Sequence, residues 1–421
     1  MATVLMSSRC PINVGRAFRI SISASCSGRK YSSSQEWDAV PFDEVKRFIV
    51  DCMVKVGTKR SHSELLADNL ATADHRGHYS HGLNRLDMYV HDIQSGITVS
   101  DKEPTVLQEL AATAYVDGQN LLGPVVGNFC MKLAIQKAEQ VGVGWVIAKG
   151  SNHYGIAGWY AMQALKKGLL IKSNSQCCMG RTILSWCGHT TMSILNAAYI
   201  KGMSFTNTSP LQVPTRARKA ILGTNPLSLA APAGDGDSFV LDMATSTAAL
   251  GKIELHDRKQ IPIPDGWGVD SNGKMSNDPK PVLDGGGLMP LGGSEVTGGY
   301  KGYGLAMLVE IFCGILGGAT YGPSIRRWKN TDRVANLGQC FIAINPDAFA
   351  PGFEVRMKDL INTCRELESA EGCDKVLVAG DPERRHIDMC QKRGGIPYHP
   401  NQIKYGKDLA AKLAVEPFKL C

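Results

Sequence analysis

The 421-residue sequence predicts an α/β fold, and three observations support this prediction. Apolar residues recur at helical spacing up to about residue 110. From about residue 111, short apolar segments typical of strands alternate with helical segments and end in glycine or polar loops. The 45 glycines and the 43% hydrophobic content provide many turns and enough core for two or three domains.

Residues 36–110 predict a helical domain. Residues 41–57 place Val45, Phe48 and Cys52 on one helical face and end at a glycine. A second helix is expected over 61–78, where Ser61 and Glu64 have capping-box spacing, and a third over 84–96. The residues between the second and third helices therefore lie at a junction, where side chains can point into a cleft.

Residues 111–298 predict a sheet domain, and residues 299–421 are expected to return to the helical domain. We expect a long apolar run at 305–319 to be a buried helix, because it is shorter than the roughly 20 residues that span a bilayer. Strands are expected at 112–117, 143–149, 202–210, 222–233, 237–252, 340–346 and 374–380, with helices at 125–142 and 156–168.

Residues 171–201 do not fit this pattern, because connections in α/β units are commonly about two to six residues long. We expect either an inserted surface excursion or a stretch foreign to the working protein. A zinc site is disfavoured, because adjacent cysteines followed by a C-x-H pair do not match structural-zinc spacing. The residues concerned are Cys177, Cys178, Cys187 and His189.

Composition limits the locations and partners that are expected. The net charge of +7 includes no block of like charges, so no nucleic-acid partner is expected, and no segment predicts a membrane span. Thirteen cysteines without a C-x-x-C pattern indicate reduced thiols rather than a disulfide framework. Residues 1–35 contain nine serines and five basic residues but no acid, which predicts a mitochondrial presequence. Without such a role for the N-terminus, a cytoplasmic location is expected.

Histidines at 75, 78 and 81 mark the helix junction. Three metal ligands from this one segment would be strained, because positions i and i+6 face different sides of a helix and Gly77 and Gly82 interrupt the run. No metal site is therefore predicted. His75 and His78 are expected mainly to shape the junction.

His81 differs from the other two because of its neighbours. Ser80 can hydrogen-bond the imidazole and fix its tautomer, and Arg85 offers a planar fork for a carboxylate. A histidine proton donor beside a carboxylate clamp is what reduction of a 2-oxo acid requires, with hydride arriving at the carbonyl carbon.

Six motifs occur in an order that resembles the type-2 malate/L-lactate dehydrogenase family, over roughly residues 37–415. They are SHGLNR, SNHYGIAGWY, GTNPLSLAAPA, LDMATSTAALGKI, IPDGWGVD and GGYKGYGLA. The family also includes ureidoglycolate and sulfolactate dehydrogenases, diketogulonate reductase and cyclic imino-acid reductases. The resemblance implies a homodimer with a non-Rossmann fold, in which a largely antiparallel cofactor-binding sheet domain packs on a helical domain from both chain ends. The sequence agrees, because no strand is followed by G-x-G-x-x-G.

The resemblance also implies roles for single residues. Ser80 and His81 match the relay serine and proton donor, and Arg85 the substrate-carboxylate contact. His153 matches a histidine assigned to the cofactor in some members and to acid–base work in others, so it is the alternative to His81. Thr224 and Lys252 are implied in substrate binding. Implied in binding NAD or NADP, besides His153, are Tyr154, Gly155, Asn225, Asp242, Met243, Ala244, Gly299, Lys301 and Gly302.

The glycine loop at 298–304 has a physical interpretation of its own. Its glycines allow backbone N–H groups to approach a phosphate, and Lys301 adds a positive charge. Arg216, Arg218 and Lys219 precede the GTNP motif and could meet a 2′-phosphate, but a solvated surface is the favoured interpretation. The choice between NAD and NADP stays open.

The expected function is NAD(P)-dependent interconversion of a small 2-hydroxy acid, malate- or lactate-like, and its 2-oxo acid. A cyclic imino-acid reductase is an alternative, but Lys252 stands where those reductases have an aspartate. Two weaker candidates are a catalytically inactive relative that serves as a binding module and a metal hydrolase. A diacid substrate needs a second cation, for which Lys252 and Arg76 are the candidates.

Overall fold

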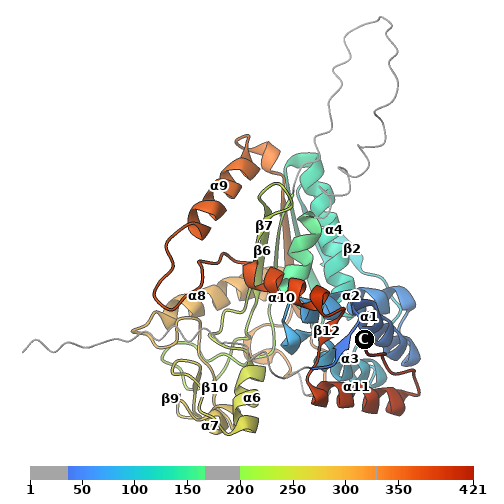
Figure 1. The fold of residues 1–421 in the computed structure, drawn as a ribbon. Helices are drawn as coiled ribbons and strands as arrows, with labels where there is room; N and C mark the ends of the chain where they lie inside the picture. Colours follow the sequence, from blue (N-terminus) through green and yellow to red (C-terminus); the bar gives the residue numbers. More distant parts are fainter. Residues whose placement is uncertain (1–36, 166–199, 328–329) are drawn as a thin grey trace, which may run out of the picture.

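The computed structural model describes residues 37–165, 200–327 and 330–421, which form an α/β structure as the sequence predicts. A seven-stranded sheet occupies the centre, helices pack beside one end of it, and a small lobe lies beside those helices (Figure 1). One apolar core continues from the helices into the sheet and its covering helix, so the two parts are packed together.

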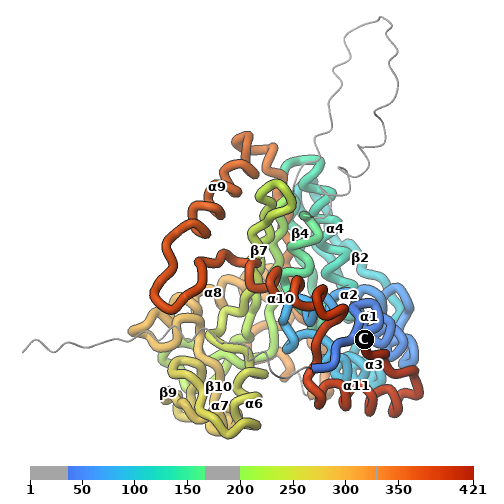
Figure 2. The backbone as a smooth tube through the Cα atoms, viewed as in Figure 1, coloured from blue at the N-terminus to red at the C-terminus, as the bar shows by residue number. Residues whose placement is uncertain are grey.

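The helical part contains both ends of the described chain (Figure 1). α1 (Phe42–Lys55), α2 (Arg60–His75) and α3 (Leu86–Gln94) pack with α11 (Pro400–Leu413). β1 (Ala39–Val40) pairs antiparallel with β12 (Ile396–Pro397). Figure 2 shows how the chain returns to these helices from α9 (Phe353–Arg365) through α10 (Asp381–Lys392).

The central sheet has the strand order β2-β3-β4-β11-β5-β6-β7. β3 and β4 are parallel and are joined by α4 (Gly123–Val141), while the other five neighbouring pairs are antiparallel. α4 lies so close to β4 that a Cβ on Gly144 would lie 1.9 Å from Ala134 O. The strands are β2 (Thr105–Glu109), β3 (Thr113–Asp117), β4 (Val143–Ser151), β5 (Lys201–Thr206), β6 (Leu227–Pro232), β7 (Ser238–Met243) and β11 (Leu337–Ile344).

The small lobe follows β7. It contains α6 (Leu250–Lys259), α7 (Pro279–Leu283) and a three-stranded sheet of β8 (Gly268–Val269), β9 (Met275–Ser276) and β10 (Gly287–Leu288). α8 (Gly299–Glu310) then continues into a π-helical turn, Ile311–Ile315. Short 3₁₀ turns occur at Tyr79–His81, Leu83–Arg85, Gly322–Ser324 and Pro346–Ala348.

The predicted insertion precedes a central strand. β5 lies between β11 and β6, and a Cβ on Gly202 in β5 would lie 2.4 Å from Ala161 O of the preceding helical residues. The helical segment described to residue 165 and β5 therefore pack directly on one another. Most of the segment 171–201, with its cysteines, lies outside the described residues.

Three expectations about local structure are wrong. Residues 374–380 form a loop rather than a strand, and this loop meets β7 through a hydrogen bond from the Val240 N–H to Ala379 O at 3.1 Å. α2 begins at Arg60 after Lys59 and has no side-chain cap, so Ser61 is not its N-cap. The helix at 305–319 is not buried all round, since Ile311 is 48% and Leu316 58% exposed.

Candidate active site

A cavity of about 520 Å³ opens where the turn between α2 and α3, the ends of β5 and β7 and the start of α6 meet. Most of the predicted site residues line it, although the Tyr154 hydroxyl turns into the core and bonds Ser204. Those lining it are Ser80, His81, Arg85, His153, Tyr154, Gly155, Thr224, Asp242, Met243, Ala244 and Lys252.

Ser80, His81 and Arg85 lie on two consecutive 3₁₀ turns. The chain leaves α2 through Gly77, whose φ of 85° favours glycine. Ser80 Oγ lies 2.8 Å from His81 Nδ1, and Arg85 Nε donates to the carbonyl oxygen of Ser80 at 2.6 Å. The serine, the imidazole and the guanidinium are therefore held as one unit.

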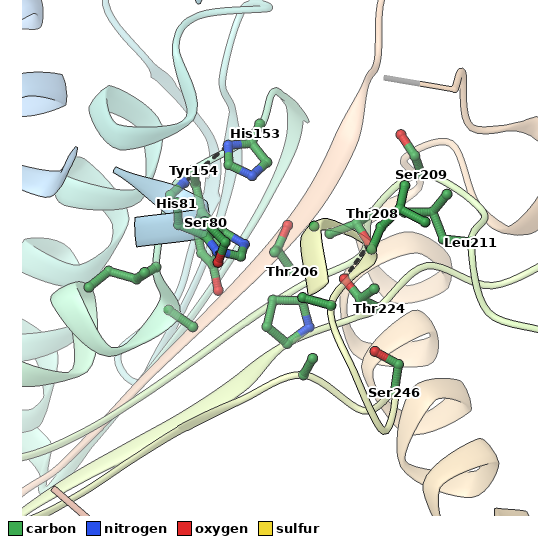
Figure 3. Close-up of a pocket in the computed structure, with 18 of the residues that line it drawn as sticks. Ser80, His81, His153, Tyr154, Thr206, Thr208, Ser209, Leu211, Thr224 and Ser246 are labelled. Atoms are coloured by element: carbon green, nitrogen blue, oxygen red, sulfur yellow. Dashed lines mark hydrogen bonds between the residues drawn. The ribbon is translucent and has the colours of Figure 1, made fainter. Parts of the chain in front are cut away.

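His153 follows β4 and lies beside His81 (Figure 3). The two rings are stacked, with centroids 5.8 Å apart and planes at 17°. The Tyr89 hydroxyl lies 2.6 Å from His153 Nδ1, and the Gly155 N–H points to the same atom at 3.4 Å. Because a backbone N–H can only donate, Nδ1 is the acceptor and neutral His153 carries its proton on Nε2.

Both histidines are neutral in this environment. Burial, together with the nearby Arg85 and His78, lowers the pKa of His81 to about 3. Burial first, and then His81 and Arg85, hold the pKa of His153 well below its usual value. Burial also raises the pKa of Tyr89, so its hydroxyl stays protonated and can donate to His153.

Hydroxyl groups line the other side of the cavity, where Thr208, Ser209, Thr224 and Ser246 face the histidines across Thr206 (Figure 3). Thr208 Oγ1 lies 3.4 Å from Thr224 Oγ1. Asp242, at the end of β7, lies near His78 and Arg76; its carboxylate accepts a hydrogen bond from the Gly158 N–H at 2.7 Å, and burial raises the pKa of its carboxyl. The hydroxyl-lined side can both donate and accept hydrogen bonds to a polar ligand.

The first turn of α6 closes the cavity next to Arg85. A Cβ on Gly251 would lie 3.8 Å from Arg85 Nη2 and 3.9 Å from Ser80 Cβ. Lys252 follows, with its Nζ 5.8 Å from the centroid of the Trp267 ring. Lys252 is therefore a further cation of the cavity wall, besides Arg85 and the buried Arg326.

Four predicted cofactor contacts do not line the cavity. Asn225 is fully buried and donates from its amide to Glu310 Oε2 at 2.8 Å. A Cβ on Gly299 would lie 1.9 Å from Gly293 O, and one on Gly302 would lie 2.3 Å from Leu291 N. These two glycines allow close packing behind Leu291, a cavity residue, while Lys301 beside them is exposed.

The cations predicted as alternatives for a second carboxylate or a 2′-phosphate also lie outside the cavity wall. Arg76 lies within electrostatic range of Glu383 and Asp242 instead. Arg216 bonds the Glu295 carboxylate through two nitrogens, at 2.8 and 2.7 Å. Arg218 donates to Asn272 Oδ1 at 3.1 Å, and neither it nor Lys219 lines the cavity.

Several cavity residues were missed by sequence reasoning. Met88 and Asp92 follow Arg85 by three and seven residues, so helical spacing from Arg85 along α3 could have found them. Asp92 Oδ2 lies 2.8 Å from Arg326 Nη2, and both side chains are buried. Nothing in the sequence links Arg326 to a residue 234 positions away. Hydroxyl residues such as Thr206 are too common to be singled out.

Of the two histidines expected to shape the junction, only His75 lies outside the cavity. The His75 ring packs on Phe42, with centroids 5.2 Å apart, whereas His78 lines the cavity with its Nε2 3.5 Å from Glu383 Oε1. Over the described ranges, no group of three or more His, Cys, Asp or Glu residues is placed to hold a metal ion. In the same ranges, none of the helices has the length and apolar character needed to cross a membrane.

The family model described as malate/L-lactate dehydrogenase matches residues 40–193 and 184–405. A malate dehydrogenase of Pyrococcus abyssi is 36% identical over 382 residues, which cover 90% of this chain and 95% of that protein. An L-sulfolactate dehydrogenase of Methanocaldococcus jannaschii is 33% identical and covers 88% and 96% of the two chains. The solved structure of malate dehydrogenase from Pyrococcus horikoshii superposes with a TM-score of 0.77 at 34% identity, covering 91% and 97%.

Proposed function

The chain belongs to the malate/L-lactate dehydrogenase family, and from this premise we propose that it is an NAD(P)-dependent oxidoreductase that interconverts a small 2-hydroxy acid and its 2-oxo acid. The observation that carries the proposal is the unit of Ser80, His81 and Arg85 in the cavity wall. It places a neutral imidazole beside a cation that can bind a carboxylate.

The cavity fits a nicotinamide nucleotide together with a small acid. Its volume of about 520 Å³ lies within the range of about 300–1,000 Å³ that is usual for small-molecule sites. Asp242 and the hydroxyl-lined side suit a ribose, since carboxylates commonly hold ribose hydroxyls in dinucleotide sites. When bound, the nicotinamide supplies or accepts the hydride. Lys301, beyond Leu291, is the proposed phosphate contact for either NAD or NADP.

The proposed cofactor domain is the central sheet, and it is not a Rossmann unit. Five antiparallel strand pairs and one parallel pair support this proposal. The glycines that follow β3 also serve packing, since a Cβ on Gly123 would lie 2.4 Å from His153 O and one on Gly127 2.4 Å from Tyr160 Cε1.

In the oxidative direction, the Arg85 fork binds the carboxylate of the 2-hydroxy acid. His81 then donates its Nδ1 proton in a hydrogen bond to Ser80 Oγ and keeps a lone pair on Nε2. That nitrogen accepts the proton of the substrate hydroxyl while C2 gives up its hydride, and the carbonyl of the 2-oxo acid forms.

In the reductive direction, His81 must carry the proton that ends on the substrate oxygen. Its pKa of about 3 is held down by burial and by the charges of Arg85 and His78. A carboxylate bound to Arg85 offsets one of these charges, so substrate binding raises the pKa of His81 and favours the imidazolium. Substrate and proton therefore bind together.

His153 takes a different role in this scheme. Because its Nδ1 accepts from Tyr89 and Gly155, its Nε2–H can only donate in the neutral ring. A donor orients the substrate oxygen or the nicotinamide amide but does not remove a proton. We therefore assign the acid–base step to His81.

Lys252 is the proposed contact for the far end of the substrate. It lines the cavity on the first turn of α6, directly after Gly251, which lies next to Arg85, and carries the charge that a second carboxylate requires. A malate-like diacid is therefore favoured over lactate. A cyclic imino acid offers no second carboxylate to this lysine.

We also propose that the protein is a homodimer. The support is a continuous exposed apolar face along α8 and the turn after it, which is unusual for a monomer. A glutamate at Leu308 or Ile311 is expected to give monomers in sedimentation experiments. The face contains Tyr300, Met307, Leu308, Ile311, Ile315 and Leu316.

Mitochondrial location is proposed on the composition of residues 1–35, which lie outside the described residues. The test is import into isolated mitochondria of the full chain and of a chain that begins at Glu36. Import of the full chain alone supports the presequence, and import of neither contradicts it.

The function is tested by nucleotide oxidation with purified protein. NADH and NADPH are each combined with oxaloacetate, pyruvate, other 2-oxo acids and a cyclic imine. Turnover with a 2-oxo acid supports the proposal, and turnover with the imine alone would contradict it. Nucleotide binding without turnover of any substrate would indicate an inactive relative. A variant lacking residues 171–201 would then show whether that segment causes the loss of activity.

A further inference from the structure

We infer that Asp74 and Tyr398 are positioning residues that hold the turn of Ser80, His81 and Arg85 in its working place. This inference rests on the proposed function for its effect on turnover. It concerns a second set of contacts, behind the cavity wall, that joins the turn to the C-terminal part of the chain.

Asp74 lies in the last turn of α2 and is 1% exposed. Its Oδ2 accepts two hydrogen bonds, from the Leu83 N–H at 2.8 Å and from the Tyr398 hydroxyl at 2.7 Å. Leu83 stands between His81 and Arg85, at the start of the second 3₁₀ turn. One carboxylate oxygen therefore fixes the centre of the catalytic turn.

The fit around Asp74 is close. A Cβ on Gly82 would lie 1.8 Å from Asp74 Oδ1, and Oδ1 itself accepts no hydrogen bond. A buried carboxylate oxygen without a partner is costly, and burial raises the pKa of this carboxyl to about 7. The sequence thus keeps an unfavourable buried acid directly against the residue that follows His81.

Other residues of the C-terminal segment contact the chain where it enters this turn. Tyr79, which precedes Ser80, donates its hydroxyl proton to Pro397 O at 3.0 Å. The His386 Nδ1 lies 2.9 Å from His75 O, and its ring lies 3.2 Å from the Cβ position of Gly77. Residues more than 300 positions away thus contact the end of α2 and the first residue of the turn.

These contacts matter because 3₁₀ turns of three residues have few hydrogen bonds of their own. A displacement of about 1 Å at a catalytic group can lower a rate by about 10²-fold. Loss of the Asp74 or Tyr398 contact should therefore lower kcat. It should leave nucleotide binding on the hydroxyl-lined side nearly unchanged.

The experiment compares Tyr398→Phe and Asp74→Ala with Tyr115→Phe in the full chain. Tyr115→Phe is the matched control, because it also removes one tyrosine hydrogen bond, to Gly317 O at 2.8 Å, in another part of the sheet. Two quantities are measured: kcat with the nucleotide KM, and the ¹H–¹³C imidazole resonance of His81. The resonance is assigned with His81→Gln.

We expect kcat to fall about 10-fold in Tyr398→Phe and about 100-fold in Asp74→Ala, with the nucleotide KM within about 2-fold of wild type. The His81 resonance should move in both variants and stay in place in Tyr115→Phe. If Asp74→Ala does not fold, Tyr398→Phe alone decides. Equal kcat and equal His81 resonances in Tyr398→Phe and Tyr115→Phe would overturn the inference.

Failure of the proposed function gives a different result. In that case the wild-type protein turns over no 2-oxo acid, while the His81 resonance still reports whether Tyr398 holds the turn. An unmoved resonance then rejects the positioning role independently of activity.

Discussion

The turn at 79–85 and the glycine loop at 298–304 differ in how they contribute to the cavity. The turn places Ser80, His81 and Arg85 directly in the cavity wall. The loop lies one layer further out, where Gly299 and Gly302 pack against the chain around Leu291. Both regions stand out in the sequence for their chemistry, yet the structure places only the first in the cavity wall.

Side chains with defined partners are therefore better indicators of a site than glycines are. A Ser-His pair with an arginine four residues later has only a few useful geometries, and one of them is found here. Glycines allow close approach of any group, and in this loop the approaching group is backbone rather than an open cradle.

The largest effect is expected for His81→Gln. Loss of the proton-transfer group should lower kcat by about 10²–10⁴-fold, while nucleotide binding stays close to wild type. Steady-state kinetics and fluorescence titration with NADH measure the two quantities. His75→Gln is the control, since its ring packs on Phe42 outside the cavity, and a similar loss there would contradict a special role for His81.

Arg85→Lys should have the next largest effect. A lysine keeps the charge but loses the planar fork and the hydrogen bond to Ser80 O, so kcat/KM for the acid should fall about 10–100-fold. Arg218→Lys, on the surface, serves as the control. An unchanged KM for the acid in Arg85→Lys would show that the carboxylate binds elsewhere.

Lys301→Ala tests the glycine loop and should act more weakly. The lysine is exposed, so its loss should raise the Kd of the nucleotide by about 10-fold or less, and the difference should shrink at high salt. Lys274→Ala, in the small lobe, is the comparison variant. If Lys301→Ala and Lys274→Ala have the same Kd for the nucleotide, the loop serves packing alone.

The smallest effect is expected on stability. The pKa of Asp74 is about 7 in the folded chain against 3.8 as its ordinary value, so the folded state binds more protons between these values. Its contribution to stability therefore falls as pH rises through this window. The quantity compared is the Tm of Asp74→Asn minus the Tm of wild type. This difference should be a few °C more positive at pH 8 than at pH 5. A difference that does not change with pH would contradict a buried, ionising Asp74.

Much of the fold could be predicted from sequence because apolar periodicity reports burial. The first three helices and the strands at 113–117, 143–151 and 337–344 follow such patterns. The prediction of a strand at 374–380 was wrong because a short apolar run fits a loop as well as a strand. The helix at 305–319 was predicted correctly, but its complete burial was not, because apolar residues on every face do not reveal which face lies open.

The site could be predicted where its residues lie close together in sequence. His81 and Arg85 share one turn, and Met88 and Asp92 continue the same face of α3. Arg326 and Tyr398 could not be found in this way, because only the folded chain brings them to α3 and to Asp74. Asn225 was predicted to contact the cofactor, but its motif does not reveal that its amide points into the core and donates to Glu310.

The most direct measurement is the pH dependence of kcat/KM for oxidation of the 2-hydroxy acid by the wild-type protein. This parameter reports the free enzyme, in which the pKa of His81 is about 3. A neutral His81 acting as the base therefore predicts a constant kcat/KM from about pH 8 down to about pH 5. A fall with a slope of one below about pH 6.5, the ordinary pKa of histidine, that persists in Asp74→Asn would contradict the buried neutral base.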